Sequence, residues 1–202
     1  MAKFILGTKQ NMTQIFDEDG KVHPVTILSV SPNVVTQVKT KEKDGYEAVQ
    51  IGHGSRKEKN LSKAVSGHLK DKGFFAILRE FRVEVGEHKE KDNIDVSVFE
   101  PGDVVQVSAI SKGKGFQGGV KRHGFHGGPR THGQKHTERS IGSIGAQGPQ
   151  KVHKGKKMPG RMGSDRVTVK NLKVLRAEND QLFIKGSIPG KRGTLVEVRS
   201  KN

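Results

Sequence analysis

The chain of 202 residues has no cysteine, no tryptophan, one tyrosine and no long apolar run. Without cysteine it can form no disulfide, no thiolate zinc site and no cysteine nucleophile. Its longest apolar stretch, residues 74–78, is far shorter than the roughly 20 residues of a membrane-spanning helix. After Met1-Ala2-Lys3, only Phe4-Ile5-Leu6 are apolar before Gly7, so no secretory apolar region is expected. The sequence therefore predicts a soluble, intracellular protein.

Acidic residues are scarce in one part of the chain. Lys and Arg number 37 against 21 Asp and Glu, for a net charge of +16. Residues 111–170 hold 14 of the cations and only Glu138 and Asp165 as anions, so this window carries +12 and the rest of the chain +4. Such a concentration of positive charge favours a polyanionic partner.

The same window contains 14 of the 26 glycines and has no helical or strand periodicity. It cannot offset its conformational entropy by burial, so we expect it to be disordered when free in water. Either it is a disordered linker or it becomes ordered on a partner. Interspersed apolar residues such as Phe116, Phe125 and Ile144 favour ordering, as do clustered glycines, which permit close backbone approach.

The flanking sequence is typical of a mainly β protein. Leu61, Val65 and Leu69 are spaced for one helix near residues 61–72, with Asn60 as its cap. Many short strands favour an antiparallel β-barrel body with one short helix and a long irregular basic insertion. Residues 1–110 and 165–202 would form the body, and residues 111–164 the extension. Strands are expected at residues 12–16, 22–30, 34–39, 46–51, 76–85, 94–98, 104–110, 167–175, 182–185 and 195–198.

Two motifs resemble catalytic or cofactor sites. Residues 113–118 match G-x-G-x-x-G, but a dinucleotide site needs a helix next, and the chain instead continues with more glycines. His123, His126, His132 and His136 have the spacing of metal ligands, yet no cysteine or carboxylate cluster supports them. We therefore predict no cofactor, no metal and no enzymatic activity. Beside phosphates, these histidines can stack on bases or donate to phosphate oxygens.

Many short motifs, in one order along nearly the whole chain, resemble the ribosomal protein L3 family of the large ribosomal subunit, in its bacterial form. They include the opening GTKQNMTQIF, the central SKGKGFQG and the later KGKKMPG. The matching stretches are residues 7–16, 24–26, 35–39, 44–46, 80–82, 111–118, 120–122, 131–133, 142–145, 154–160 and 166–169.

This resemblance implies a barrel at the subunit surface and an extension that threads ribosomal RNA toward the peptidyl transferase centre. It also implies a role in early subunit assembly, large-subunit proteins as neighbours and a cytoplasmic, ribosomal location, without membrane or small-molecule substrate. Some bacterial members carry a methylated glutamine, for which Gln147 is the nearest candidate. The tip would comprise Gly142, Ile144, Gly145 and Gln147. The residues expected to bind ribosomal RNA are Lys112, Lys114, Phe116, Lys121, Arg122, His123, Phe125, His126, Arg130, His132, Lys135, His136, Arg139, Lys151, Lys154, Lys156, Lys157, Arg161 and Arg166.

Two rival functions remain. A free nucleic-acid-binding regulator or RNA chaperone should contain a self-contained readout module, such as aromatic-bearing strands. A metal-dependent enzyme should have ligands in the body of the protein.

Overall fold

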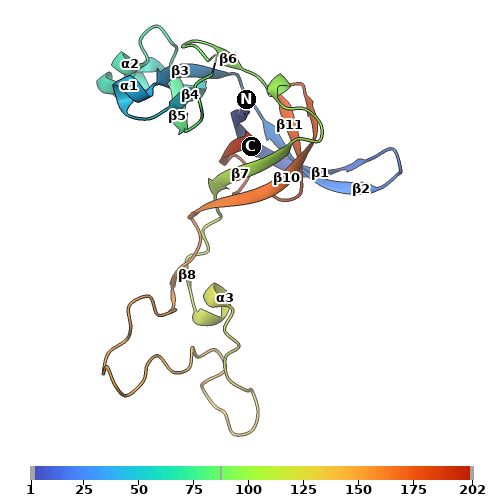
Figure 1. Cartoon of the computed structure of the whole chain (residues 1–202). Helices are drawn as coiled ribbons and strands as arrows, with labels where there is room; N and C mark the ends of the chain where they lie inside the picture. The colour runs from blue at the N-terminus through green and yellow to red at the C-terminus, as the bar shows by residue number, and fades with distance from the viewer. Residues whose placement is uncertain (1–2, 87, 201–202) are drawn as a thin grey trace. The chain divides into compact units, whose positions relative to one another are not determined.

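The computed structural model describes residues 3–86 and 88–200 and is mainly β (Figure 1). Among the described residues, no helix is long and apolar enough to cross a membrane. The strands are β1 Phe4–Phe16, β2 Val22–Ser29, β3 Asn33–Lys39, β4 Ala48–Ser55, β5 Phe75–Phe81, β6 Asn93–Ile94, β7 Val104–Ile110, β8 Phe116–Gln117, β9 Gly160–Arg161, β10 Arg166–Glu178, β11 Gln181–Lys185 and β12 Leu195–Ser200. The helices are α1 Lys41–Asp44, α2 Lys63–His68 and α3 Gly119–His123, with 3-10 turns at Glu58–Asn60 and Val96–Val98.

The chain divides into two units, which we call the body (Met1–Ile110 and Arg166–Asn202) and the basic unit (Ser111–Asp165). In the body, six antiparallel strands form a closed ring in the order β1-β12-β7-β10-β11-β2. The two 13-residue strands make this possible, because each is long enough to pair with two neighbours. β1 pairs with β12 through residues 4–8 and with β2 through residues 8–16, while β10 pairs with β7 through residues 166–173 and with β11 through residues 174–178. Inward residues such as Val105, Val107, Val196 and Val198 are buried.

The remaining strands of the body form a second sheet, in the order β5-β4-β3-β6. Buried Asn33 joins β3 to the ring, because it accepts from the Leu6 amide at 3.3 Å and donates to the Leu6 carbonyl at 3.1 Å. Phe4 of β1 stacks on Phe81 of β5 with ring centroids 4.9 Å apart. The body therefore contains a second sheet beside the closed ring, which the expectation of an antiparallel β-barrel body did not include.

Several predicted elements differ in extent. β1 begins at Phe4 rather than at residue 12. The prediction missed its first part because Phe4-Ile5-Leu6 is buried on both faces and shows no alternation. The strand expected at residues 94–98 is only β6 followed by a 3-10 turn, in which the Phe99 amide donates to Val96 O. β7 has its predicted bounds.

The prediction of one short helix is also wrong, because the described residues contain three. The helix expected over residues 61–72 shrinks to α2, capped by the Ser62 hydroxyl and not by Asn60. It ends at His68 with Leu69 as its C-cap, and the left-handed conformation of Asp71, with φ of 65°, is incompatible with a helix that continues to residue 72. α1 is a single turn closed by Gly45 in the left-handed region, too short to show a helical period.

Candidate nucleic-acid interface

The basic unit contains twelve lysines and arginines against Glu138 and Asp165. The structure exposes eleven of these cations, and only Arg122 is half-buried. Phe116 is 77% exposed beside them. The unit therefore presents a dense, solvated cationic surface with an exposed aromatic ring.

Main-chain hydrogen bonds join the two ends of the basic unit. The Ser111 amide donates to Asp165 O at 2.9 Å, Lys114 N to Met162 O at 2.9 Å, and Met162 N to Gly115 O at 3.0 Å. β8 and β9 continue this ladder, with Phe116 opposite Arg161. Gly163 lies so close to Lys112 O that a Cβ would collide with it. The expectation of a wholly irregular insertion is wrong here, because backbone pairing needs no apolar face. Arg161 lies on β9, while Lys112 and Lys114 lie on the hydrogen-bonded stretch that leads into β8.

Next to the ladder lies α3, which the sequence pattern did not predict. It starts after Gly118 and ends at Gly124, whose φ of 73° suits only glycine well. Gly119 is buried beneath Ile141 and Phe125, where a side chain would collide with both. A helix therefore does follow the glycine motif at residues 113–118, contrary to expectation. Every paired strand described is antiparallel, however, so the parallel βαβ context of a dinucleotide site is missing.

Three residues expected to contact RNA have partners within the basic unit. Arg122 Nη1 donates to the Met158 carbonyl at 2.7 Å, and His123 Nε2 lies 3.0 Å from the same oxygen. The His123 ring lies 5.8 Å from that of half-buried Phe125. These contacts tie α3 to the segment before β9. Arg122, His123 and Phe125 thus contribute to the shape of the unit.

The other predicted contacts of the basic unit lie on its surface. His126, His132 and His136 are exposed, and the described residues contain no group of three or more metal-ligating side chains. Arg130 forms an exposed ion pair with Glu138 at 2.7 Å. The remaining predicted cations are all exposed: Lys112, Lys114, Lys121, Lys135, Arg139, Lys151, Lys154, Lys156, Lys157 and Arg161.

The predicted tip is exposed along its length. Ile144 is 40% exposed and Gln147 is exposed. Of the two tip glycines, Gly142 has a φ of 75°, whereas Gly145 has no positive φ and a Cβ there would meet only Lys151 O at 3.8 Å. Only Gly142 therefore needs to be glycine for reasons internal to the chain.

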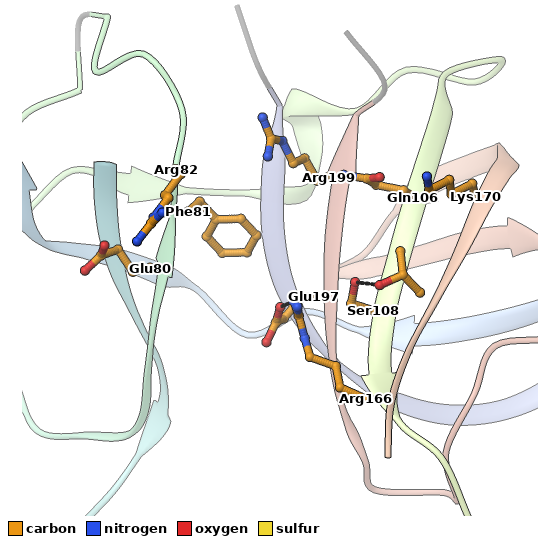
Figure 2. A pocket seen from close by; sticks show the side chains of 10 residues that line it. Glu80, Phe81, Arg82, Gln106, Ser108, Arg166, Lys170, Glu197 and Arg199 are labelled. Atoms are coloured by element: carbon orange, nitrogen blue, oxygen red, sulfur yellow. Dashed lines mark hydrogen bonds and ion pairs between the residues drawn. The ribbon is translucent and has the colours of Figure 1, made fainter. Parts of the chain in front are cut away.

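The body contributes a polar cleft that the sequence pattern did not reveal (Figure 2). It is lined by residues at the end of β5 and on β10, β7 and β12, and these include Ser108 and Thr168, whose hydroxyl oxygens are 2.7 Å apart. Four cations line it: Arg82, Arg166, Lys170 and Arg199. Alternation along β10 and along β12 indicates which residues of each strand share a face. The sequence does not show that both strands pair with β7 in a register that brings these two faces together.

The two carboxylates of this cleft are already neutralised. Glu197 contacts both Arg79, at 3.1 Å, and Arg166. Glu80 pairs with Lys39 at 2.8 Å. Among the described residues, neither Lys170 nor Arg199 has an ion-pair partner. Their charges are therefore available to an anionic ligand.

A mainly β body joined to an exposed, strongly cationic unit is typical of structural basic proteins that associate with nucleic acids. Residues 76–181 match the family model of ribosomal protein L3. The large ribosomal subunit protein uL3 of Heliobacterium modesticaldum is 51% identical over 98% of this chain and 96% of its own length. Those of Finegoldia magna (48%) and Roseiflexus sp. (53%) match 98% of this chain and 97% of their own. The chain therefore belongs to the ribosomal protein L3 family, which comprises structural proteins and not enzymes, and the predicted resemblance is confirmed.

Proposed function

We propose that this protein is a structural constituent of the large ribosomal subunit that binds large-subunit ribosomal RNA through residues 111–164. The observation that carries the proposal is the exposure of eleven of the twelve cations of the basic unit. Each exposed lysine or arginine can neutralise a phosphate and release a counterion. The names of its relatives support the ribosomal setting.

The ordered parts of the basic unit position these charges. The ladder positions Lys112, Lys114 and Arg161. The contacts of Arg122 and His123 with Met158 hold α3 against the segment before β9. Exposed Phe116 offers an aromatic face for stacking on an unpaired base. The unit thereby acts as a shaped clamp for converging RNA strands.

The exposed tip would reach toward the peptidyl transferase centre. It has a single cation, Arg139, among residues 139–150, so it adds little to binding strength. Ile144 is large enough to pack against a base or ribose, and exposed Gln147 is accessible to a methyltransferase. The charged arms on either side would support early subunit assembly.

The body would act as an antiparallel barrel at the subunit surface, beside other large-subunit proteins. Its cleft is suited to a second contact with the RNA backbone, because the Lys170 and Arg199 side chains and the Ser108 and Thr168 hydroxyls are donors of the kind that bind phosphate.

Sedimentation of the tagged full-length protein from cell extracts tests the proposal. We expect co-migration with large subunits at high salt. Migration as a free protein at high salt would instead support the rival function of a nucleic-acid-binding regulator or RNA chaperone. As a control, the triple variant Lys154→Gln, Lys156→Gln, Lys157→Gln should enter subunits less efficiently, because three phosphate contacts are lost.

A further inference from the structure

The β1–β2 hairpin continues beyond the ring as a two-stranded ribbon (Figure 1). β12 pairs with β1 only as far as Thr8, and β11 pairs with β2 only as far as Val25. Beyond these points, residues 12–16 pair with residues 22–26, and in the described part of the chain the last main-chain contact of this ribbon with β11 and its following residue is the hydrogen bond from the Gly186 amide to Pro24 O at 2.8 Å. A free two-stranded ribbon is marginally stable in water, so this one would gain from being covered.

One face of this ribbon is apolar and solvent-exposed. Phe16 lies opposite Val22, and Gln14 lies opposite Pro24, so these residues and Met12 share a face. Phe16 is 60% exposed, Met12 48% and Val22 47%, and Pro24 is also exposed. Apart from Gln14, which is also exposed, the exposed side chains of this face are apolar, and such a cluster marks an interaction surface, unlike a single exposed leucine.

The end of the ribbon is held in a defined shape. The Gly20 amide donates to Asp17 O at 3.0 Å, and the Lys21 amide donates to Asp17 Oδ1 at 2.8 Å. The other carboxylate oxygen of Asp17 lies 2.8 Å from His23 Nε2. The apolar face is therefore preorganised, which lowers the entropic cost of docking.

The charge of the ribbon differs from that of the rest of the molecule. Residues 10–24 contain Asp17, Glu18 and Asp19 but only one cation, Lys21, in a chain with a net charge of +16. Three clustered carboxylates repel RNA phosphates. They complement lysine and arginine around an apolar groove on a protein.

We propose that the apolar face of the β1–β2 ribbon, formed by Met12, Phe16, Val22 and Pro24, docks into an apolar groove of a second, basic protein whose cations meet the carboxylates of residues 17–19. The inference rests on the proposed function in one respect, because it places that partner in the large ribosomal subunit. The ribbon is thus a protein-binding arm, whereas the basic unit binds RNA.

Photo-crosslinking in assembled subunits tests this docking. The photoreactive amino acid p-benzoylphenylalanine replaces Phe16 or, in a second protein, Val22 in the full-length chain, and large subunits are purified and irradiated. Both probes should cross-link to one and the same protein, at a segment that mass spectrometry shows to combine apolar residues with Lys or Arg. A probe at exposed Thr13, on the opposite face of the ribbon, is the matched control and should give little of this product.

A charge-reversal variant tests the charge complementarity. Adding Glu18→Lys and Asp19→Lys to the Phe16 probe should lower the yield of the protein cross-link severalfold, and an unchanged yield overturns the assignment of a basic partner. Cross-links to RNA alone, or none, in subunits that contain the chain overturn the docking inference and leave the proposed function standing. If the wild-type chain is absent from large subunits, the proposed function and this inference fail together.

Discussion

Arg122 Nη1 donates a 2.7 Å hydrogen bond to the carbonyl oxygen of Met158, 36 residues further along the chain. The guanidinium also lies over Gly160, where a Cβ would come within 2.6 Å of Nη1. One arginine therefore fixes the distance between the two arms of the basic unit just beside the β8–β9 ladder.

Arg122→Ala should loosen that ladder in the free protein. A hydrogen bond from a charged donor contributes about 1.5 kcal/mol, which corresponds to roughly tenfold in a local opening equilibrium. Hydrogen exchange at the Lys114 and Met162 amides reports the effect directly. Lys121→Ala removes the same charge from an exposed neighbour and should leave both amides unchanged. Equal exchange in the two variants would show that Arg122 does not brace the arms.

A substitution at a tip glycine can distinguish contacts within the chain from contacts with RNA. Gly145→Val should leave the free protein unaffected, because Gly145 has no positive φ and a Cβ there would meet only Lys151 O, at an ordinary contact distance of 3.8 Å. In ribosomes the same change should reduce puromycin reactivity, since an added side chain would meet packed RNA. Subunit profiles and puromycin assays check both statements. Normal reactivity of Gly145→Val ribosomes would mean that the tip does not press against RNA near the catalytic centre.

Gly127→Ala is the matched comparison for that experiment. Gly127 has a φ of 77°, and a Cβ there would collide with Glu138 O. This variant should therefore disturb the basic unit before any RNA is bound, as faster exchange of the Gly128 amide, which donates to Thr137 O at 3.1 Å. An unchanged exchange rate at Gly128 would contradict the assignment of an internal role to this glycine.

The cleft of the body should contribute measurably to RNA affinity. Lys170→Gln with Arg199→Gln should flatten the slope of log K against log [salt] for large-subunit ribosomal RNA by about 1.4 to 1.8, if two phosphate contacts are lost. Exposed Lys59 and Lys63, changed together to Gln, provide a control with equal charge loss on another part of the body. Equal slopes in the two double variants would place no phosphate in the cleft.

His53 should make the body less stable in mild acid. Its side chain is buried between the Thr8 and Ser31 hydroxyls, at 3.4 and 3.3 Å, and this burial lowers its pKa from the ordinary value of 6.5. The unfolded chain then binds more protons than the native one below about pH 6.5, so the free energy of unfolding falls as pH falls from 7 to 5. Denaturant titrations at the two pH values should show a smaller drop for His53→Gln. Equal decreases in the free energy of unfolding of the two proteins would contradict this explanation.

Local pattern and composition predicted much of this molecule. Alternating Val104–Ile110 has the predicted bounds because Val105, Val107 and Ala109 are buried in the core, whereas the polar residues Gln106 and Ser108 lie on the opposite face of β7. The fully buried segment Phe4-Ile5-Leu6 shows no alternation, and so its strand was missed. Likewise the ladder around Phe116 and Gly160 has no apolar face, so nothing in its side-chain pattern marks it as paired.

By itself, the sequence determined the family, through many ordered motifs, and the position of the charge, through the run of cations in residues 111–170. Only the tertiary structure decided which of those cations form hydrogen bonds or ion pairs within the chain and which are available to a ligand. Arg122 meets Met158, and Arg166 meets Glu197, across 36 and 31 residues. It also gathered Arg82, Lys170 and Arg199 around one cleft. The physical reason is that charge and periodicity are local properties of the chain, whereas each of these contacts depends on strand registers set by the burial of distant residues.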